Sequence, residues 1–316
     1  MSMIDSHMHL GLAGYDLQSI LENMDRQGID VTWLLTWEEN NPPVKELHIG
    51  LPPEPALEAY NRYPDRFVPF YAPDPSSPDL RRVFKNYREQ GIRGCGELKV
   101  SLRWEDPLIE TYLEIVREYH FPLIFHMENP RYHYILPGEG FFSWLLERLL
   151  NDKFNGVSSY YLTRLADSTG ILRKKIRSSR VAFPGILFDF AFLEKRVSGF
   201  PKVKFIGHGP DFWNHISTEQ HPKYIHQKGP INQFGIIDRL LESYPNFYCD
   251  ISGLSGFNAL NRDHAMARKF LLKHAGKILF GTDNTRLPLL DLLRSMKLGK
   301  ENMARILSGN ASRVLE

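Results

Sequence analysis

The sequence contains few cysteines and no long hydrophobic run. Its two cysteines, Cys95 and Cys249, are far too few for a disulfide framework. No uninterrupted run of eighteen apolar residues occurs, so the sequence predicts no segment that spans a bilayer. The N-terminus, MSMIDSHMHL, lacks the basic and long apolar regions of a signal peptide. From these absences we expect a soluble, cytoplasmic protein.

The chain also lacks an excess of charge of either sign. Its 39 Lys and Arg residues nearly balance 37 Asp and Glu residues, which gives a formal net charge of +2. Such a balance creates no strong field toward nucleic acid or an anionic membrane, and we expect neither as a partner. Hydrophobic residues make up 42% of the chain and charged residues 24%, as in ordinary globular proteins. This composition excludes a disordered or fibrous chain.

Short runs of β-branched and aromatic residues alternate with amphipathic segments along the 316 residues. Eight such runs predict strands at residues 3–9, 31–37, 67–72, 93–100, 123–128, 203–208, 246–252 and 277–283. The intervening segments predict helices at residues 16–27, 78–90, 107–119, 186–197, 236–243 and 259–274. Eight alternating units in one domain, residues 1–316, favour a (β/α)8 TIM-type barrel. An open, doubly wound sheet is the competing fold.

Two segments interrupt the alternation. Residues 38–55 contain five prolines and predict a stiff, irregular loop after the second strand. Residues 130–182 predict a helical insertion after the fifth strand, with an apolar helix at 141–150 and a basic stretch at 173–180. The insertion suggests a lid or a subunit contact, and hence a homodimer; a solvated insertion is the alternative.

The first strand carries two histidines with the same parity. In Ile4-Asp5-Ser6-His7-Met8-His9, alternate residues share a face, so His7 and His9 project together, roughly 6.6 Å apart along the strand. Two imidazoles on one face can converge on a metal ion. Asp5 has the same parity and could accept the second ring N–H of a ligand histidine. A structural role for the histidines is the alternative.

Other strands end in polar residues. A strand buried in a parallel sheet is a nearly continuous apolar run, so a polar residue at its carboxyl end is informative. The fifth, sixth and eighth predicted strands end in His126, His208 and Asp283, and the fourth carries Glu97 and Lys99. Barrel enzymes build their sites at this edge. Several imidazoles with a carboxylate there form a plausible zinc site with an open position for water.

The ordered set Asp5-x-His7-x-His9, His126, His208 and Asp283 resembles the amidohydrolase superfamily of metal-dependent (β/α)8 barrels. It resembles most the "amidohydrolase 2" branch, which includes aminocarboxymuconate-semialdehyde decarboxylase, related acid decarboxylases and pyrone-dicarboxylate lactonase. Phe-Ile-Gly-His-Gly-Pro at residues 205–210 and Phe-Gly-Thr-Asp-Asn at 280–284 resemble that branch's sixth and eighth strands. Asn-Ala-Ser-Arg-Val-Leu at 310–315 resembles its C-terminal helix.

The resemblance implies that His7, His9, His126 and Asp283 bind a divalent ion, with zinc the first expectation. It makes His208 the residue that polarises the substrate or transfers a proton. These roles agree with the chemistry of the side chains. A zinc-activated water is available near neutral pH, Asp283 could accept its proton, and His208 could stabilise an oxyanion.

Glu97 departs from the decarboxylase pattern. A glutamate on the fourth strand is similar to that of other superfamily branches, where it bridges two metals. Cys95, Glu97 and Lys99 share a face by parity, so Glu97 or a carboxylated Lys99 could recruit a second ion, with His208 as one of its ligands. A salt bridge or a substrate contact of Glu97 is equally consistent with the sequence, and one or two ions remain open.

Loop residues near the expected mouth are candidates for substrate binding. Arg131 and Arg286 follow His126 and Asp283 closely and could each bind a substrate carboxylate bidentately, although most loop arginines are solvated. Asp250, with Ser252, ends the seventh strand and could line the pocket or brace it.

The leading hypothesis is a metal-dependent hydrolase that cleaves a C–N or C–O bond, in an amide, lactone or ester, of a small carboxylated substrate. The alternative is a zinc-dependent, non-oxidative decarboxylase of an unsaturated or aromatic acid, because the ligand set suits both reactions. A barrel that retains the ligands but acts only as a scaffold or sensor is a third hypothesis.

Overall fold

The fold is built around eight parallel strands in a computed structural model that describes residues 2–44, 50–136, 140–151, 157–168, 178–221 and 223–316. One sheet has the order β1 (Ile4–Met8), β2 (Val31–Trp37), β3 (Phe67–Ala72). The other has the order β10 (Ile278–Leu279), β9 (Phe247–Asp250), β8 (Phe205–His208), β5 (Leu123–His126), β4 (Cys95–Leu98). Every pairing within these two sheets is parallel.

Backbone hydrogen bonds join the two sheets at both pairs of edges. Between β3 and β4, the Arg93 N–H donates to the Pro69 carbonyl (3.0 Å) and Tyr71 N–H donates to that of Gly94 (3.1 Å). Between β1 and β10, Ser6 N–H donates to the Phe280 carbonyl at 2.9 Å. The eight strands therefore form a ring, which confirms the predicted barrel and excludes the open, doubly wound sheet.

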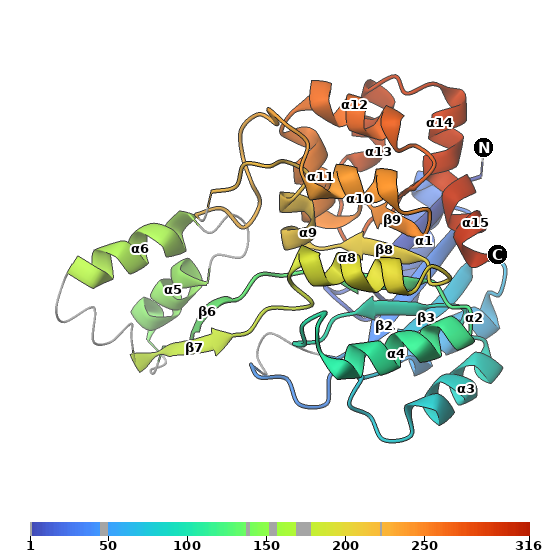
Figure 1. The fold of residues 1–316 in the computed structure, drawn as a ribbon, viewed down its shortest axis with the longest axis horizontal. Helices are drawn as coiled ribbons and strands as arrows, with labels where there is room; N and C mark the ends of the chain where they lie inside the picture. The colour runs from blue at the N-terminus through green and yellow to red at the C-terminus, as the bar shows by residue number, and fades with distance from the viewer. Residues whose placement is uncertain (1, 45–49, 137–139, 152–156, 169–177, 222) are drawn as a thin grey trace.

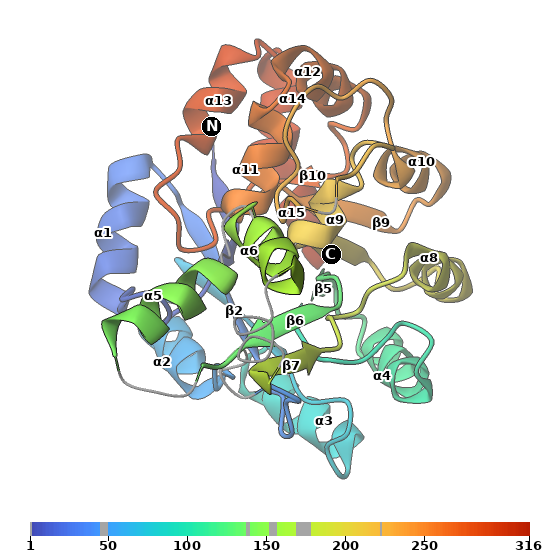
Figure 2. The ribbon, with the colours of Figure 1, turned by 90° about the vertical axis from the view of Figure 1, so that its left-hand side faces the viewer.

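Helices surround this ring, as Figure 2 shows. They are α1 (Leu17–Gln27), α2 (Glu54–Arg62), α3 (Leu80–Gln90), α4 (Pro107–Glu118), α8 (Phe190–Gly199), α10 (Ile236–Ser243), α11 (Gly253–Asn261) and α12 (His264–Lys273). Short elements complete the chain: α9 (Pro210–Asn214), α13 (Leu289–Ser295), α14 (Lys300–Ala304), the π-helical turn η2 (Arg305–Gly309) and α15 (Asn310–Leu315).

An apolar cluster fills the inside of the barrel. Each strand except β4 contributes to it: Ile4, Trp33, Leu35, Phe70, Ile124, Ile206, Tyr248 and Leu279. Ala311 and Val314 of α15 pack against the same cluster. Side chains alternate along a strand, so His126, His208 and Asp250 continue the inward face two residues beyond Ile124, Ile206 and Tyr248. The polar side chains therefore lie on an apolar floor at the carboxyl end of the barrel.

Two helix predictions and one loop prediction differ from the structure. The helix expected at residues 186–197 begins only at Phe190 (α8), because Ile186 pairs with Glu128 in an antiparallel bridge. Residues 259–274 were expected to form one helix, but α11 ends at Asn261 and α12 begins at His264, after Asp263 caps the new helix by accepting from the Met266 N–H. The expected irregular loop at 38–55 already turns into α2 at Glu54. Asp263 sets the start of α12 and Pro53 sets the start of α2, and the spacing of apolar residues reveals neither boundary.

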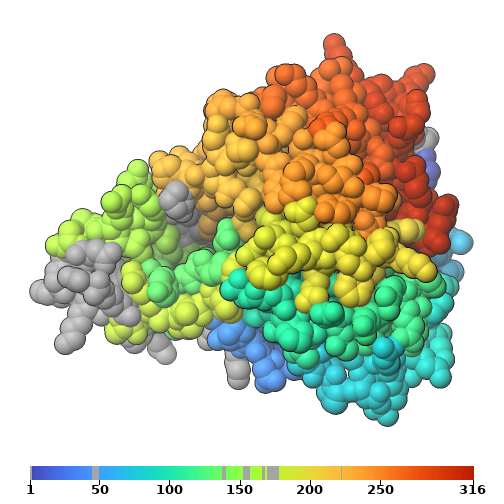
Figure 3. Space-filling view, in the orientation of Figure 1, coloured from blue at the N-terminus to red at the C-terminus, as the bar shows by residue number. Residues whose placement is uncertain are grey.

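The insertion after β5 projects from the barrel (Figures 1 and 3). It contains β6 (Arg131–Tyr134), α5 (Phe141–Leu150), α6 (Val157–Ser168) and β7 (Arg180–Phe183), and β6 pairs with β7 in antiparallel fashion. Helix α5 has the bounds expected of the apolar helix. The basic stretch at 173–177 lies outside the described residues, and a lid or subunit contact stays a prediction. No helix in the described part of the chain is long and apolar enough to cross a membrane.

Candidate metal centre

His7 and His9 point their outer ring nitrogens at each other at the end of β1. The two Nε2 atoms lie 3.1 Å apart, and both residues are buried. The His9 Nδ1–H donates to the Leu35 carbonyl (2.9 Å), which can only accept, so His9 Nε2 presents a lone pair. His7 Nδ1 lies 2.5 Å from Asp250 Oδ2. This contact orients the His7 ring as the Leu35 carbonyl orients that of His9, with Nε2 directed into the centre. A protonated His7 Nε2 can donate to the His9 lone pair, and a deprotonated one can share a cation with it.

Two carboxylates face the same space. Glu97 of β4 approaches His9 Nε2 at 3.6 Å, and Asp283 approaches it at 3.5 Å and His7 Nε2 at 3.8 Å. Burial raises the pKa of Glu97, but the charges of Lys99 and His126 outweigh it and hold this pKa well below its ordinary value. The pKa of Asp283 is also lowered, because contacts with the neighbouring histidines outweigh burial. Both carboxylates are therefore ionised at neutral pH.

The histidines respond to these neighbours in different ways. Burial and the nearby His7 lower the pKa of His9 to about 4, which leaves a neutral ring suited to bind a metal. Burial lowers the pKa of His7, the Asp250 charge raises it, and the net result is a raised pKa. Burial likewise opposes a raised pKa at His208, but Asp250 and Asp283 bring it to about 10. The centre thus combines a neutral His9 ring, two histidines of raised pKa and ionised carboxylates.

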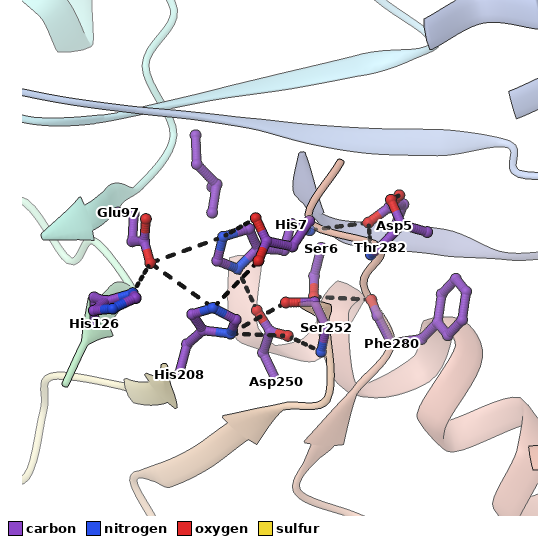
Figure 4. A network of polar contacts seen from close by, with 12 residues as sticks. Asp5, Ser6, His7, Glu97, His126, His208, Asp250, Ser252, Phe280 and Thr282 are labelled. Carbon is purple, nitrogen blue, oxygen red and sulfur yellow. Dashed lines mark hydrogen bonds and ion pairs between the residues drawn. The ribbon is translucent and has the colours of Figure 1, made fainter. Parts of the chain in front are cut away.

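A second set of donors meets at the Glu97 oxygen Oε1, which also lies 4.0 Å from His7 Nε2 (Figure 4). His126 Nδ1 of β5 lies 2.8 Å from Glu97 Oε1, and His208 Nε2 of β8 lies 4.0 Å from the same oxygen. His208 Nε2 is also 3.6 Å from Asp283 Oδ2. The Ser252 hydroxyl contacts the other ring nitrogen of His208 at 3.2 Å.

These side chains form overlapping sets of three donors, each with its ligand atoms within 4.8 Å of one another. We call His7, His9 and Glu97 the His7–His9 group, and Glu97, His126 and His208 the His126–His208 group. Asp283 forms a further set with His7 and His208. The structure thus brings together all the ligands expected from the sequence, with His126 in a different group from His9. Glu97 belongs to both groups.

Asp5 does not have the role that its parity suggested. Its carboxylate accepts hydrogen bonds from the His7 N–H (3.1 Å) and from the Thr282 N–H (2.9 Å) and hydroxyl (2.6 Å). The acceptor for the ring of His7 is Asp250 of β9 instead. The register of β1 shifts between Asp5 and Met8, so the simple alternation of faces does not hold across this segment.

The last ligand candidate lies on a strained turn after β10. Asp283 and Asn284 have φ values of 50° and 52°, in the left-handed region that Asp and Asn tolerate best. The Asn284 side chain accepts from the His9 N–H (2.7 Å) and donates to the His9 carbonyl (2.7 Å). The turn therefore ties Asp283 to the end of β1, where His9 lies.

A cavity of about 670 Å³ lies between the insertion and the loop after β8; none of the ligand candidates lines it, and Glu128 connects it to the centre. Glu128 and Arg131 line it, and Glu128 Oε2 lies 3.7 Å from His126 Nε2. Arg131 forms an ion pair with Glu128 and stacks over Phe183. Arg286 has an exposed side chain on the turn after Asp283 and does not line this cavity.

Sequence reasoning did not find Glu128, and it left the role of Asp250 open. Burial raises the pKa of Glu128, but contacts with His126 and Arg131 outweigh it and lower this pKa to about 2. The only sequence signal was its position two residues after His126. Lys99, considered as a metal-binding residue, lies 4.0 Å from Glu97 Oε2 and 4.9 Å from the centre of the Trp37 ring.

No protein-family model and no curated protein sequence matches the chain. Solved structures do share its fold. An uncharacterized TIM-barrel protein from Bordetella bronchiseptica has a TM-score of 0.59 and 14% identity, with 100% of this chain and 98% of that chain covered. A probable 2-pyrone-4,6-dicarboxylic acid hydrolase from Acinetobacter baumannii, with citric acid bound, has a TM-score of 0.53 and 13% identity, covering 100% and 99%.

A third similar structure contains a metal. The 5-carboxyvanillate decarboxylase from Novosphingobium aromaticivorans, complexed with manganese and 4-hydroxy-3-methoxy-5-nitrobenzoic acid, has a TM-score of 0.50 and 13% identity. The alignment covers 95% of this chain and 80% of that chain. At these identities the likeness establishes the fold: the chain is a TIM barrel of the kind found in these hydrolase and decarboxylase structures.

Proposed function

We propose that the chain is a metal-dependent hydrolase of the amidohydrolase superfamily, with residues 1–316 as one catalytic domain. Its substrate is a small carboxylated molecule with a C–N or C–O bond, in an amide, lactone or ester. One observation carries this proposal: the facing Nε2 atoms of His7 and His9, 3.1 Å apart, next to the ionised carboxylates of Glu97 and Asp283. Such a donor set is suited to a divalent cation.

The donor chemistry favours zinc. Imidazole nitrogens with carboxylate oxygens are typical zinc ligands, although manganese suits the same carboxylates. The His7–His9 group, completed by Asp283, would hold one ion, and the His126–His208 group would hold a second, with Glu97 shared between them. A bound divalent ion supplies a water of lowered pKa and polarises a substrate carbonyl.

Asp283 and His208 are the residues proposed to move protons. Asp283 lies near both His7 and His208, and we propose that its carboxylate accepts the proton of the attacking water and returns it to the leaving group. Burial alone would lower the pKa of His208, but Asp250 and Asp283 raise it to about 10, so with one ion at the His7–His9 group we propose that His208 carries a positive charge close to where the oxyanion develops. With a second ion at the His126–His208 group, His208 would be neutral and a ligand of that ion instead. These two roles need no residue outside the described centre.

The cavity beside the centre is the proposed substrate site. Its volume of about 670 Å³ is within the range of small-molecule sites. Arg131 can offer the N–H groups that Glu128 does not use to a substrate carboxylate, because a guanidinium has five donors. Arg286 is proposed to bind a second carboxylate from the rim. The hydrolase with a similar fold is named for a dicarboxylic acid, which agrees with this substrate class.

Non-oxidative decarboxylation of an unsaturated or aromatic acid is the second candidate. The likeness of the fold to a manganese-containing 5-carboxyvanillate decarboxylase favours it. The presence of two donor groups that share Glu97 favours hydrolysis, because a pair of metal ions is commonly used to activate water. Measuring carbon dioxide release against acid release over a panel of aromatic acids, lactones and amides separates the two reactions.

Replacement of Asp283 tests the proposal directly. The variant Asp283→Asn keeps the size of the side chain but removes the proton acceptor, so turnover should fall by at least about 10²-fold, the lower range for loss of a general base. Rates are measured on the substrate that the panel identifies, with the exposed Asp291→Asn as matched control. Full activity of Asp283→Asn in a normally folded protein contradicts the proposed mechanism.

A further inference from the structure

Glu128 lies between the candidate metal centre and the insertion. It is the second residue after His126, and its side chain is only 19% exposed. Its backbone forms both hydrogen bonds of an antiparallel bridge with Ile186: the Glu128 N–H donates to the Ile186 carbonyl (3.0 Å), and the Ile186 N–H donates to the Glu128 carbonyl (2.9 Å). The carboxylate is therefore held by a fixed backbone.

The ring of His126 is placed between two carboxylates. Its Nδ1 lies 2.8 Å from Glu97 Oε1, while its Nε2 lies 3.7 Å from Glu128 Oε2. Figure 4 shows the ring directed toward Glu97, on the side where His208 also lies. Nδ1 is thus the nitrogen that faces the His126–His208 group. Nε2 is the nitrogen whose N–H can point to Glu128 when Nδ1 acts as a ligand.

The hairpin of the insertion holds Glu128 on its other side. Arg131, the first residue of β6, forms an ion pair with Glu128. Its guanidinium lies 4.7 Å from the centre of the ring of Phe183, the buried residue of β7 that pairs with Arg131. Gly185 allows this close approach, because a Cβ there would lie 2.7 Å from the Glu128 carbonyl oxygen.

We propose that Glu128 is a positioning residue that, held by Arg131 of the insertion hairpin, orients His126 Nδ1 toward a metal ion in the His126–His208 group. The inference rests on the proposed function, since it assigns a role at that same centre. Carboxylates that accept the second ring N–H of a ligand histidine fix the orientation of the ring and raise its basicity as a ligand. On this account the base of the insertion supports the metal site.

The test is a titration of metal-stripped protein with Zn²⁺ by isothermal titration calorimetry at one pH. The variant His126→Ala first identifies the binding event that depends on His126. Glu128→Gln, which keeps the size of the side chain and removes its charge, should weaken that event by about 10–100-fold. Binding at the His7–His9 group should not change. Arg131→Met should weaken the same event, since it leaves Glu128 without its ion-pair partner.

Glu194→Gln is the matched control, because Glu194 also pairs with an arginine, Arg239, but on the outer helices. It should leave both binding events unchanged. Unchanged Zn²⁺ affinity in both Glu128→Gln and Arg131→Met overturns the inference, and so does an equal weakening of every event. If the wild-type protein binds no Zn²⁺ at all, both the inference about Glu128 and the proposed metal-dependent function are wrong. If the wild-type protein binds Zn²⁺ but the variants do so equally well, only the inference about Glu128 is wrong.

Discussion

At the scale of single residues, the orientation of each imidazole ring is set by what its inner nitrogen contacts. His9 donates to the Leu35 carbonyl, His7 contacts Asp250, and His208 contacts Ser252. In each case the other nitrogen, Nε2, is directed into the centre. Ring orientation is therefore a property of these partners as much as of the histidines themselves.

Asp250 provides a test of this principle. In Asp250→Asn the partner of His7 loses its charge, so Zn²⁺ binding at the His7–His9 group should weaken by about 10–100-fold. Calorimetric titration of the metal-stripped variant measures the change. Asp291→Asn, an exposed carboxylate on α13, is the control and should bind as the wild-type protein does. Wild-type affinity in Asp250→Asn would show that the Asp250 charge does not support the ligand.

The sequence predicted the members of the centre better than their contacts. The shared parity of His7 and His9, and the polar ends of β5 and β8, followed from strand periodicity alone. The role of Asp5 did not, because a shift of register inside β1 turns its carboxylate toward Thr282. Glu128 was missed because its relation to His126 depends on the bridge with Ile186, 58 positions further along the chain.

At the scale of elements, the boundary between α11 and α12 depends on one capping residue. Asp263 accepts from the Met266 N–H at the start of α12 and from the Ile231 N–H in the loop before α10. Asp263→Ala removes both bonds and should cost about 1–2 kcal/mol of stability. Thermal unfolding should show a Tm lower by about 2–4 °C. Asp263→Asn keeps one acceptor oxygen, and hence one of the two bonds, so its Tm should fall less than that of Asp263→Ala; an equal loss in both variants contradicts the capping role.

The contact between α10 and α12 should make stability depend on pH. Burial raises the pKa of Asp238, but hydrogen bonds from Lys273 and His274 outweigh it and hold this pKa below its ordinary value of 3.8. A carboxyl group whose pKa is depressed by folding stabilises the folded state above its unfolded-state pKa. This stabilisation is lost as the pH falls through the lower, folded-state value.

The free energy of unfolding of the wild-type protein should therefore exceed that of Asp238→Asn at pH 6, and the difference should shrink below about pH 4. Guanidinium unfolding of both proteins between pH 3 and pH 7 measures it. A difference that is constant over this range would mean that ionisation of Asp238 does not contribute. Asp291→Asn again provides an exposed control.

At the scale of the whole molecule, metal binding should stabilise the fold. Glu97, Asp250 and Asp283 are ionised carboxylates brought together at the carboxyl end of the barrel, where neighbouring histidines hold their pKa values low and a divalent ion would be attracted by the same charges. Zn²⁺ at a hundred times its dissociation constant should add about 2.7 kcal/mol of stability. This corresponds to a Tm increase of about 4 °C for a chain of this size.

Differential scanning calorimetry with added Zn²⁺ and with a chelator measures this shift. The double variant His7→Ala, His9→Ala lacks the facing nitrogens and should show a much smaller response to Zn²⁺. An identical shift in the double variant would mean that the ion binds elsewhere.

The sequence by itself determined the alternation of strands and helices, which favoured a barrel over an open sheet, and the chemical types of residue at the strand ends. These are local properties, because hydrophobic periodicity and the polar end of an apolar run are readable from neighbouring residues. The tertiary structure alone decided that Glu97 belongs to both donor groups, that Asp250 rather than Asp5 orients His7, and that Glu128 lies beside His126. The physical reason is that distances between side chains on different strands depend on the register of those strands, which closure of the ring sets.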